Sequence, residues 1–284
     1  MNGVGDRVGV AWRDELALDI HTHLEHIDCL ELLADRELKA GRRRLRALKE
    51  LARQVPLSVH SVALGLACSE PVGTDRLELL GRLVGEIEPS HWSEHLAFVR
   101  AGGYEIGHLA APPYAERTLE GLKDNVERAR RAIGSLPHLE NIATLLWPAG
   151  SRMSEEAFVR QAIRQTGSPL LLDLHNLYAN AWNFKKDPLA ALDALPLERI
   201  ASIHISGGVR VRDGAGEERL IDDHIHDPPE VVFEMLSHVA ARCRQPLEVI
   251  IERDGRYPEF AQILAQIERA RRALATGRMM ALAA

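Results

Sequence analysis

The feature that most constrains this chain is a repeated alternation of short apolar runs with longer amphipathic stretches. Leu57–Val62 is rich in β-branched residues, and Thr74–Ile87 follows it with apolar residues at helical spacing. Pro169–Leu174 is apolar almost throughout, as expected of a strand that is buried on both faces of a parallel sheet. Strands that alternate with helices indicate parallel strands joined by helical crossovers. The sequence therefore predicts an α/β fold.

Eight short apolar runs and seven amphipathic stretches can be followed along the 284 residues. The predicted strands are Cys29–Leu33, Leu57–Val62, Ser90–His95, His138–Ile142, Pro169–Leu174, Ile200–Ile205, Leu220–Ile225 and Leu247–Ile251. The predicted helices are Asp35–Gln54, Thr74–Ile87, Ala115–Ile133, Ser154–Gln165, Pro188–Leu195, Pro229–Arg242 and Pro258–Leu274. This pattern fits a closed (β/α)8 TIM barrel, which needs about 250 residues. We expect one domain over residues 1–284, with 1–25 as an N-terminal extension and 275–284 as a frayed tail.

Charge, hydropathy and cysteine spacing exclude several classes of protein. The net charge of −6 lacks the basic excess of a nucleic-acid-binding protein. No run of about 18 apolar residues is present to span a membrane, and Met1–Arg13 lacks the apolar core of a secretory signal. The three cysteines are widely spaced, which predicts neither a disulfide framework nor a thiolate zinc site. We therefore expect a cytoplasmic protein with no nucleic-acid or membrane partner.

Residue types that bind metals recur where the predicted strands end. They are His60, His95, Glu140, Asp173, His204, Asp222, His224 and Glu252, with His175 and Asn176 directly after Asp173. All strands of a (β/α)8 barrel point the same way, so these side chains should meet at the C-terminal face, where such barrels hold their active sites. Two residues apart on a strand, Asp222 and His224 should project to the same side, as should Asp173 and His175.

Electrostatics favour metal ions at this face over simple acid–base chemistry. Several converging carboxylates repel one another unless cations or protons neutralise them, and mixed histidine and carboxylate ligands suit divalent or trivalent metals. The set exceeds the needs of one ion, which predicts a cluster with a bridging carboxylate, for which Glu140 is the candidate. Taken singly, the residues have ordinary structural explanations: Asp173 fits the cap of a turn, and Glu140 could pair with an arginine.

The same residues carry a family resemblance that spans nearly the whole chain. The matching stretches are HSVALGL (60–66), SEHL (93–96), LEN (139–141), LLLDLHNLYANAWN (170–183), HISG (204–207), LIDDH (220–224) and IERD (251–254). They resemble the xylose isomerase and endonuclease IV superfamily of barrels. More closely, the chain is similar to the DUF692 family, the multinuclear non-heme iron-dependent oxidases.

This resemblance implies two or three iron ions in mixed Fe(II) and Fe(III) states, with O2 as co-substrate. The implied ligands are His60, His95, Glu140, Asp173, Asn176, His204, Asp222, His224 and Glu252. The implied activity is modification of a residue, often cysteine, in a ribosomally synthesised precursor peptide, which a small partner protein presents. Asp254 is implied as a catalytic base or a residue beside the ligands, and His175 as an extra ligand or a substrate contact.

Four positions depart from the family pattern. Gly208 stands where members of the family usually have a second histidine, four residues after His204. Phe184 follows Asn183, at a position where the family often has a histidine. His175 replaces a common asparagine, and His226 is an addition. These departures bear on a third metal position and on the substrate more than on a two-metal core.

Three other functions stay open at this point. A zinc-dependent phosphodiesterase of the endonuclease IV type is compatible with the ligand order, although the acidic charge balance disfavours DNA as a substrate. A sugar isomerase would also use one or two divalent metals, but SEHL and DLHNLY fit it less well. A non-catalytic, metal-bound scaffold that binds peptides would be expected to have lost ligands, and the set is intact.

Overall fold

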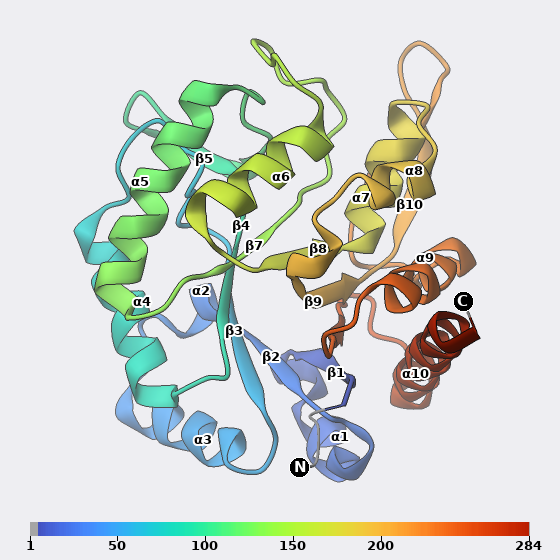
Figure 1. The fold of residues 1–284 in the computed structure, drawn as a ribbon. Coiled ribbons are helices and arrows are strands. Elements are labelled where there is room, and N and C mark those ends of the chain that lie inside the picture. The colour runs from blue at the N-terminus through green and yellow to red at the C-terminus, as the bar shows by residue number, and fades with distance from the viewer. Residues whose placement is uncertain (1–4, 284) are drawn as a thin grey trace. The chain divides into compact units, whose positions relative to one another are not determined.

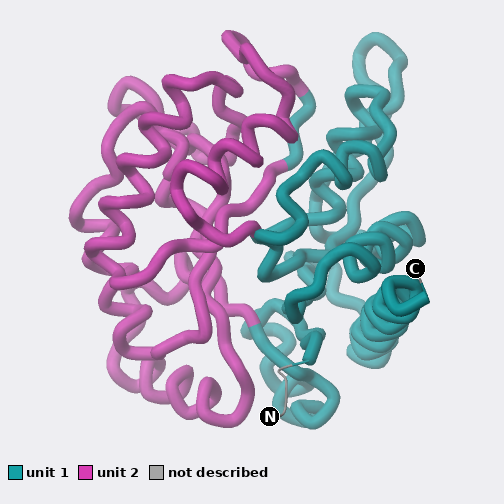
Figure 2. Tube along the Cα trace, in the orientation of Figure 1, with its two compact units in different colours: residues 1–30, 143–145, 171–284 teal, residues 31–142, 146–170 magenta. Residues whose placement is uncertain are grey.

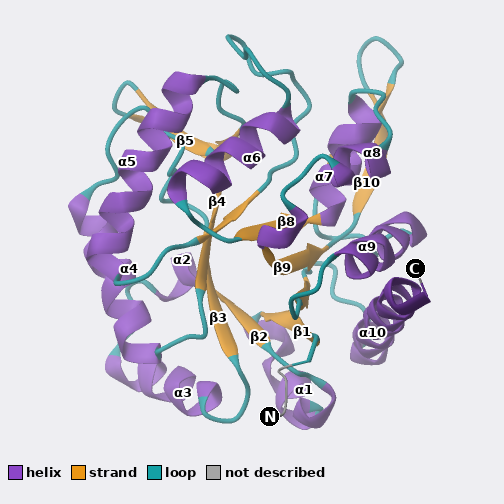
Figure 3. Cartoon of the chain, in the orientation of Figure 1, coloured by secondary structure: helices purple, strands orange, loops and turns teal. Residues whose placement is uncertain are grey.

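The computed structural model describes residues 5–283, and eight of the strands in this range form a closed barrel (Figure 1). In their order around the barrel these strands are β1 (Arg7–Trp12), β12 (Glu248–Ile251), β9 (Ile200–Ile205), β8 (Leu170–Asp173), β7 (His138–Glu140), β4 (Trp92–His95), β3 (Leu57–Ser61) and β2 (Leu30–Leu33). Helices alternate with the barrel strands along the chain (Figure 3). The predicted (β/α)8 barrel is therefore confirmed.

The chain divides into two compact units, which Figure 2 colours separately. Unit 1 comprises residues 1–30, 143–145 and 171–284, and unit 2 comprises residues 31–142 and 146–170. In unit 1, β12 pairs in parallel with both β1 and β9, with Ile251 opposite Val10 on one side and Ile205 on the other. Strands β9 and β12 therefore end at one level, and β1 continues to Trp12 beside the residues that follow them.

The helices of unit 1 follow its strands. They are α1 (Ala17–Thr22), α7 (Leu174–Asn183), α8 (Pro188–Asp193), α9 (Glu230–Arg242) and α10 (Phe260–Ala283), with short 3-10 turns at Asp14–Leu16, Leu24–His26 and Leu197–Arg199. A Cβ atom at Gly277 of α10 would lie 2.1 Å from the carbonyl oxygen of Ser237 on α9. Only glycine permits so close a helix contact, which fixes α10 against α9.

Unit 2 places its own helices beside β3, β4 and β7. These helices are α2 (Ala34–Glu37), α3 (Arg42–Ala52), α4 (Thr74–Ile87), α5 (Glu116–Ile133) and α6 (Glu155–Thr166), and β5 (Phe98–Ala101) pairs with β6 (Tyr104–Ala110) in a hairpin. The Ser154 hydroxyl accepts a hydrogen bond from the Ala157 amide at 3.2 Å, which confirms Ser154 as the cap of α6. Leu45, Leu48 and Leu51 of α3 are buried, as their helical spacing predicts.

Two strand predictions were wrong. The first barrel strand is β1, which lies inside the segment predicted as an N-terminal extension. Its glycine weakens the strand signal, yet a Cβ at Gly9 would lie 1.7 Å from the Cys29 carbonyl oxygen, so the close strand approach requires glycine. Leu220–Ile225 is not a barrel strand, because β11 (Glu218–Asp222) pairs antiparallel with β10 (Gly208–Arg212) in a separate hairpin.

Several helix boundaries also differ from the predictions. The segment predicted as one helix, Asp35–Gln54, is two helices, with Gly41 as the extended cap of the second. Helix α10 continues to Ala283, beyond the predicted helix end at Leu274. Helix α7 was not predicted, because its sequence was treated as the end of a strand and a loop. Across residues 5–283, no helix combines the length and apolar character needed to cross a bilayer.

Candidate metal site

Three predicted ligands of unit 2 lie together at the ends of neighbouring strands. His60 is on β3, His95 ends β4 and Glu140 ends β7, where it stands opposite His95 in the parallel register. Oε2 of Glu140 lies 3.5 Å from Nε2 of His60 and 3.3 Å from Nε2 of His95. All three side chains are buried. We call His60, His95 and Glu140 the unit 2 cluster.

Neighbouring polar groups orient the two histidines of the unit 2 cluster. Nδ1 of His60 lies 2.8 Å from the Ser93 hydroxyl, which leaves Nε2 directed at Glu140. The rings of His60 and His95 meet edge to face with centroids 4.7 Å apart. The carboxylate of Glu94 accepts hydrogen bonds from the backbone amides of His95 and Leu64, at 2.8 and 3.0 Å. The buried Glu94 therefore holds the backbone of this cluster.

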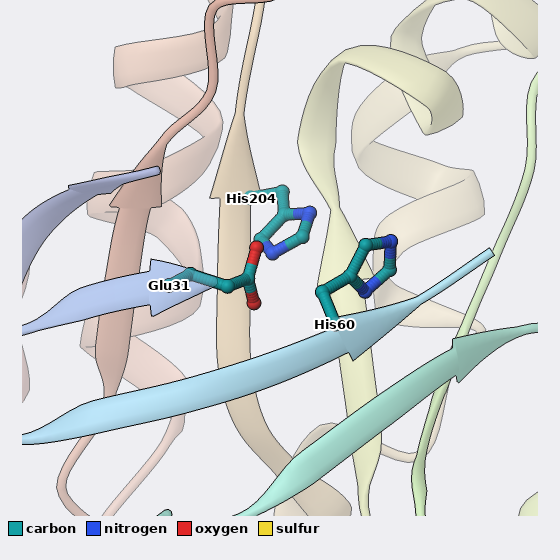
Figure 4. Close-up of side chains that lie close together, drawn as sticks. All are labelled: Glu31, His60 and His204. Carbon is teal, nitrogen blue, oxygen red and sulfur yellow. The ribbon is translucent and has the colours of Figure 1, made fainter. Parts of the chain in front are cut away.

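Glu31 is a buried carboxylate that the sequence analysis did not select. It lies on β2, and one of its carboxylate oxygens is within 4.8 Å of a ring nitrogen of His60. Figure 4 shows Glu31, His60 and His204 on the strands that carry them. The available signal was a charged residue inside the apolar run Cys29–Leu33, which is costly to bury unless it has a partner.

Unit 1 holds a second group of predicted ligands. Asp173, His224 and Glu252 each offer a ligand atom within 4.8 Å of the others, and we call them the unit 1 cluster. Nδ1 of His224 lies 3.3 Å from Oε2 of Glu252, and its Nε2 lies 4.0 Å from Oδ2 of Asp173. His204, at the end region of β9, brings its Nδ1 to 3.2 Å from the same Glu252 oxygen. Oε2 of Glu252 therefore lies close to two imidazoles, that of His224 in the unit 1 cluster and that of His204 beside it.

Burial and charge act in opposite directions on the unit 1 groups. Burial alone lowers the pKa of His224, but the carboxylates of Glu252 and Asp222 raise it well above its ordinary value. Burial likewise opposes ionisation of Glu252, yet His224 and His204 hold its pKa well below the usual range. Without a cation, the cluster therefore favours ionised carboxylates around a protonated His224.

Asp222 connects His224 to His175. Its Oδ2 lies 2.9 Å from Nε2 of His224, and its Oδ1 lies 2.7 Å from Nδ1 of His175. Burial raises the pKa of Asp222, but the hydrogen bonds from His175 and His224 outweigh it and lower that pKa to about 2. Asp222 is therefore ionised at neutral pH.

Neither His175 nor His224 lies on a strand, so the prediction from strand periodicity was wrong. His175 lies in the first turn of α7, because Asp173 ends β8 and caps that helix by accepting a hydrogen bond from the Asn176 amide at 2.6 Å. His224 lies beyond the end of β11 and has a φ of 55°. Asp222 and His224 converge because the chain turns, and not because they share a strand face. A left-handed histidine is strained, which is common at functional sites.

The remaining predicted residues occupy different surroundings. Asn176 is buried in α7 directly beside Asp173. The Asp254 side chain is 44% exposed, and its Oδ2 lies 3.6 Å from Nδ1 of His224. His226 pairs with Asp223, with 2.8 Å between Nδ1 and Oδ2. Phe184 is the residue that ends α7.

Arg13 is a functional candidate that sequence reasoning missed. It directly follows β1 and its side chain is only 2% exposed, although it is a permanent cation. Its Nε donates to Asp254 at 3.0 Å, and its Nη2 lies 3.4 Å from Oε1 of Glu252. Because β1 was not recognised as a barrel strand, Arg13 was not recognised as a strand-end residue.

The donors of both clusters suit metal ions. Each combines imidazole nitrogen with carboxylate oxygens, and the separations of 3.3–4.0 Å between these atoms suit ligands that surround one ion at about 2.0–2.2 Å. Buried carboxylates in this number are costly without a neutralising cation. The residues present therefore fit metal binding in each unit.

Comparison with known proteins identifies the family. Residues 7–275 match the model described as RiPP precursor modification enzyme MbnB/TglH/ChrH, where RiPP denotes a ribosomally synthesised and post-translationally modified peptide. The chain belongs to this family. The resemblance seen in its motifs is therefore confirmed.

Two relatives named UPF0276 protein show how far the likeness extends. One from Streptomyces avermitilis is 35% identical over 274 residues, which cover 94% of this chain and 54% of that protein. The present chain thus spans about half the length of that relative. One from Acaryochloris marina is 32% identical over 92% of this chain and 92% of its own length.

Solved structures with low sequence identity share the fold. A xylose isomerase domain-containing protein from Salmonella typhimurium has a TM-score of 0.60 at 16% identity, and covers 97% of this chain and 99% of its own. The 3-keto-D-glucoside 4-epimerase from Escherichia coli has a TM-score of 0.59 at 12% identity, with coverage of 94% and 99%. These likenesses establish a xylose isomerase-like TIM barrel for the chain.

Proposed function

We propose that this protein is an iron-dependent oxidase that uses O2 to modify a residue, foremost a cysteine, of a ribosomal precursor peptide in natural-product biosynthesis. The observation that carries the proposal is the pair of buried histidine and carboxylate clusters, one in each unit, in a chain from a family that modifies RiPP precursors. Histidine and carboxylate donors are compatible with redox-active iron, and they leave positions for exogenous ligands.

In this proposal each cluster binds one ion. His60, His95 and Glu140 hold one, and Asp173, His224 and Glu252 hold another. The further ligands are His204, Asp222 and Asn176. Bound iron would supply the electrons for O2 chemistry and a positive charge that favours the thiolate form of a substrate cysteine. The role of Glu140 as a bridge stays a prediction.

The chain's own residues would manage protons around the metals. Asp254 is the proposed base, because its carboxylate is more solvent-accessible than those of the neighbouring Asp222 and Glu252. Its Oδ1 accepts a hydrogen bond from Arg13, so Oδ2 is the oxygen available to take a proton. Burial and the charge of Glu252 raise the pKa of Asp254, but the neighbouring His224 and Arg13 outweigh them and lower it. Asp254 is therefore ionised and ready to accept a proton at neutral pH.

Co-expression with a candidate peptide tests the function. A short cysteine-containing reading frame beside the gene would supply the peptide, with and without a neighbouring small protein as the proposed presenting partner. Intact-mass spectrometry should reveal a mass change with the wild-type chain and none with Glu140→Gln. Glu127→Gln, on the exposed face of α5, is the matched control and should behave as wild type. A mass change that persists in Glu140→Gln would contradict a reaction that depends on the unit 2 cluster.

A further inference from the structure

His175 is buried in a way that directs only one of its nitrogens at the metal-site residues. Its side chain is 0% exposed, and Nδ1 lies 2.7 Å from Oδ1 of Asp222. Because an ionised carboxylate only accepts hydrogen bonds, Nδ1 carries the proton and donates it. Nε2 has no hydrogen-bond partner among residues 5–283. His175 is therefore held through Nδ1 and through packing.

Gly208 provides the space that the His175 ring occupies. A Cβ atom at position 208 would lie 2.5 Å from Cε1 and 3.0 Å from Nε2 of His175. The same atom would lie 2.1 Å from the carbonyl oxygen of Ile221. Gly208 is paired with Asp222 in the first register position of the β10–β11 hairpin. Nε2 thus faces the bare backbone of Gly208, and the hairpin brings Asp222 to the other nitrogen of the same ring.

We propose that His175 is a positioning residue, which fixes Asp222 through its Nδ1 hydrogen in a slot that glycine at position 208 keeps open. With Oδ1 held by His175, the other oxygen of Asp222 is presented to His224, 2.9 Å away. His175 then acts through Asp222 and touches neither metal nor substrate. The effect on metal binding rests on the proposed function, in which Asp222 is a metal ligand. Replacing the hydrogen-bond partner of a metal ligand typically weakens metal binding about 10- to 100-fold.

Two substitutions at His175 separate its hydrogen bond from its bulk. Asparagine retains an N–H donor near the place of Nδ1, whereas leucine fills similar space without a donor. Fe(II) affinity is measured anaerobically by competition with a chromophoric chelator. His175→Leu should weaken Fe(II) binding by about 10-fold or more, and His175→Asn should restore most of it. Equal affinities in the wild type, His175→Leu and His175→Asn would overturn the inference, as would an equal loss in both variants.

The slot is tested by two glycine substitutions in the same hairpin region. Gly208→Ala should weaken Fe(II) binding as His175→Leu does, because the added methyl collides with the ring and with the β11 backbone. Gly214→Ala is the matched control, since a Cβ there meets nothing within 4 Å. If both substitutions leave Fe(II) affinity unchanged, Gly208 does not keep the slot open and that part of the inference fails.

A measurement on metal-free protein keeps the inference separate from the proposed function. Nitrogen-15 NMR of the His175 imidazole should show a protonated Nδ1 and an unprotonated Nε2 in the wild type. The opposite tautomer would overturn the inference, even in a protein that binds iron. Conversely, a wild type that binds no Fe(II) but shows the Nδ1–H tautomer would contradict the proposed function and retain the hydrogen bond to Asp222.

Discussion

The guanidinium of Arg13 joins two acidic residues that follow the last barrel strand. Its Nε donates to Oδ1 of Asp254 at 3.0 Å, and its Nη2 lies 3.4 Å from Oε1 of Glu252. Strands β1 and β12 are paired in parallel, so their C-terminal ends bring Arg13 and these acids together. A buried cation at this point offsets the carboxylates of the unit 1 cluster and fixes the direction of Asp254.

Replacing Arg13 should therefore destabilise the protein and its metal site together. Arg13→Gln leaves buried acids without their cation, and loss of one partner of a buried ion pair costs about 3–5 kcal/mol. The midpoint temperature of thermal unfolding and the affinity for Fe(II) should both fall. Arg7→Gln is the control, because Arg7 pairs with Glu248 at 2.7 Å near the opposite ends of the same strands. Equal Fe(II) affinity in the two variants would show that Arg13 does not support the site.

Ser93→Ala tests the orientation of His60. Metal binding through Nε2 leaves Nδ1 of His60 protonated, and that hydrogen is donated to the Ser93 hydroxyl, 2.8 Å away. Loss of this acceptor should reduce metal affinity about 10-fold with little effect on unfolding. Chelator competition measures the affinity. Ser58 is a buried serine on β3, two residues before His60, and Ser58→Ala should leave the metal affinity unchanged. If Ser93→Ala binds Fe(II) as tightly as the wild type, Ser93 does not orient His60 for metal binding.

His138 should make folding sensitive to acid independently of metal. It stacks on His91 with ring centroids 4.1 Å apart, and burial lowers its pKa to about 4. The unfolded chain takes up a proton below about pH 6.5, whereas the folded chain resists it until about pH 4. The stabilisation is therefore present above pH 6.5 and is lost as pH falls from 6.5 to 4, by ~3 kcal/mol in total.

Urea unfolding of metal-free protein at several pH values measures this dependence. His138→Gln should flatten the fall in the free energy of unfolding between pH 6.5 and pH 4. His108→Gln, at an exposed histidine, should retain the wild-type slope. If His138→Gln retains the wild-type slope as well, the acid sensitivity arises elsewhere.

The fold was predictable because most barrel strands are continuous apolar runs. Leu170–Asp173 is completely buried, and no alternating pattern was needed to recognise it. β1 was missed because Gly9 weakens its apolar signal, and the reason for the glycine is a tertiary contact with Cys29. β11 was misplaced because a strand of a short antiparallel hairpin has the same local pattern as a strand of the barrel.

The candidate site was predictable to the extent that its ligands end strands. His95 and Glu140 meet because their strands are adjacent and in register. His224 reaches Glu252 through a left-handed turn, which no periodicity indicates. Gly208 was seen as a departure from a family pattern, and only the structure relates it to the ring of His175.

Iron content is the most direct test of whether the two clusters bind iron. Protein purified anaerobically is analysed for metal per chain, together with His95→Ala from the unit 2 cluster and His224→Ala from the unit 1 cluster. We expect at least two irons in the wild type, about one fewer in each variant, and a retained barrel fold by circular dichroism. A wild type that holds a single zinc or no metal, or variants that keep the full iron content, would contradict this expectation.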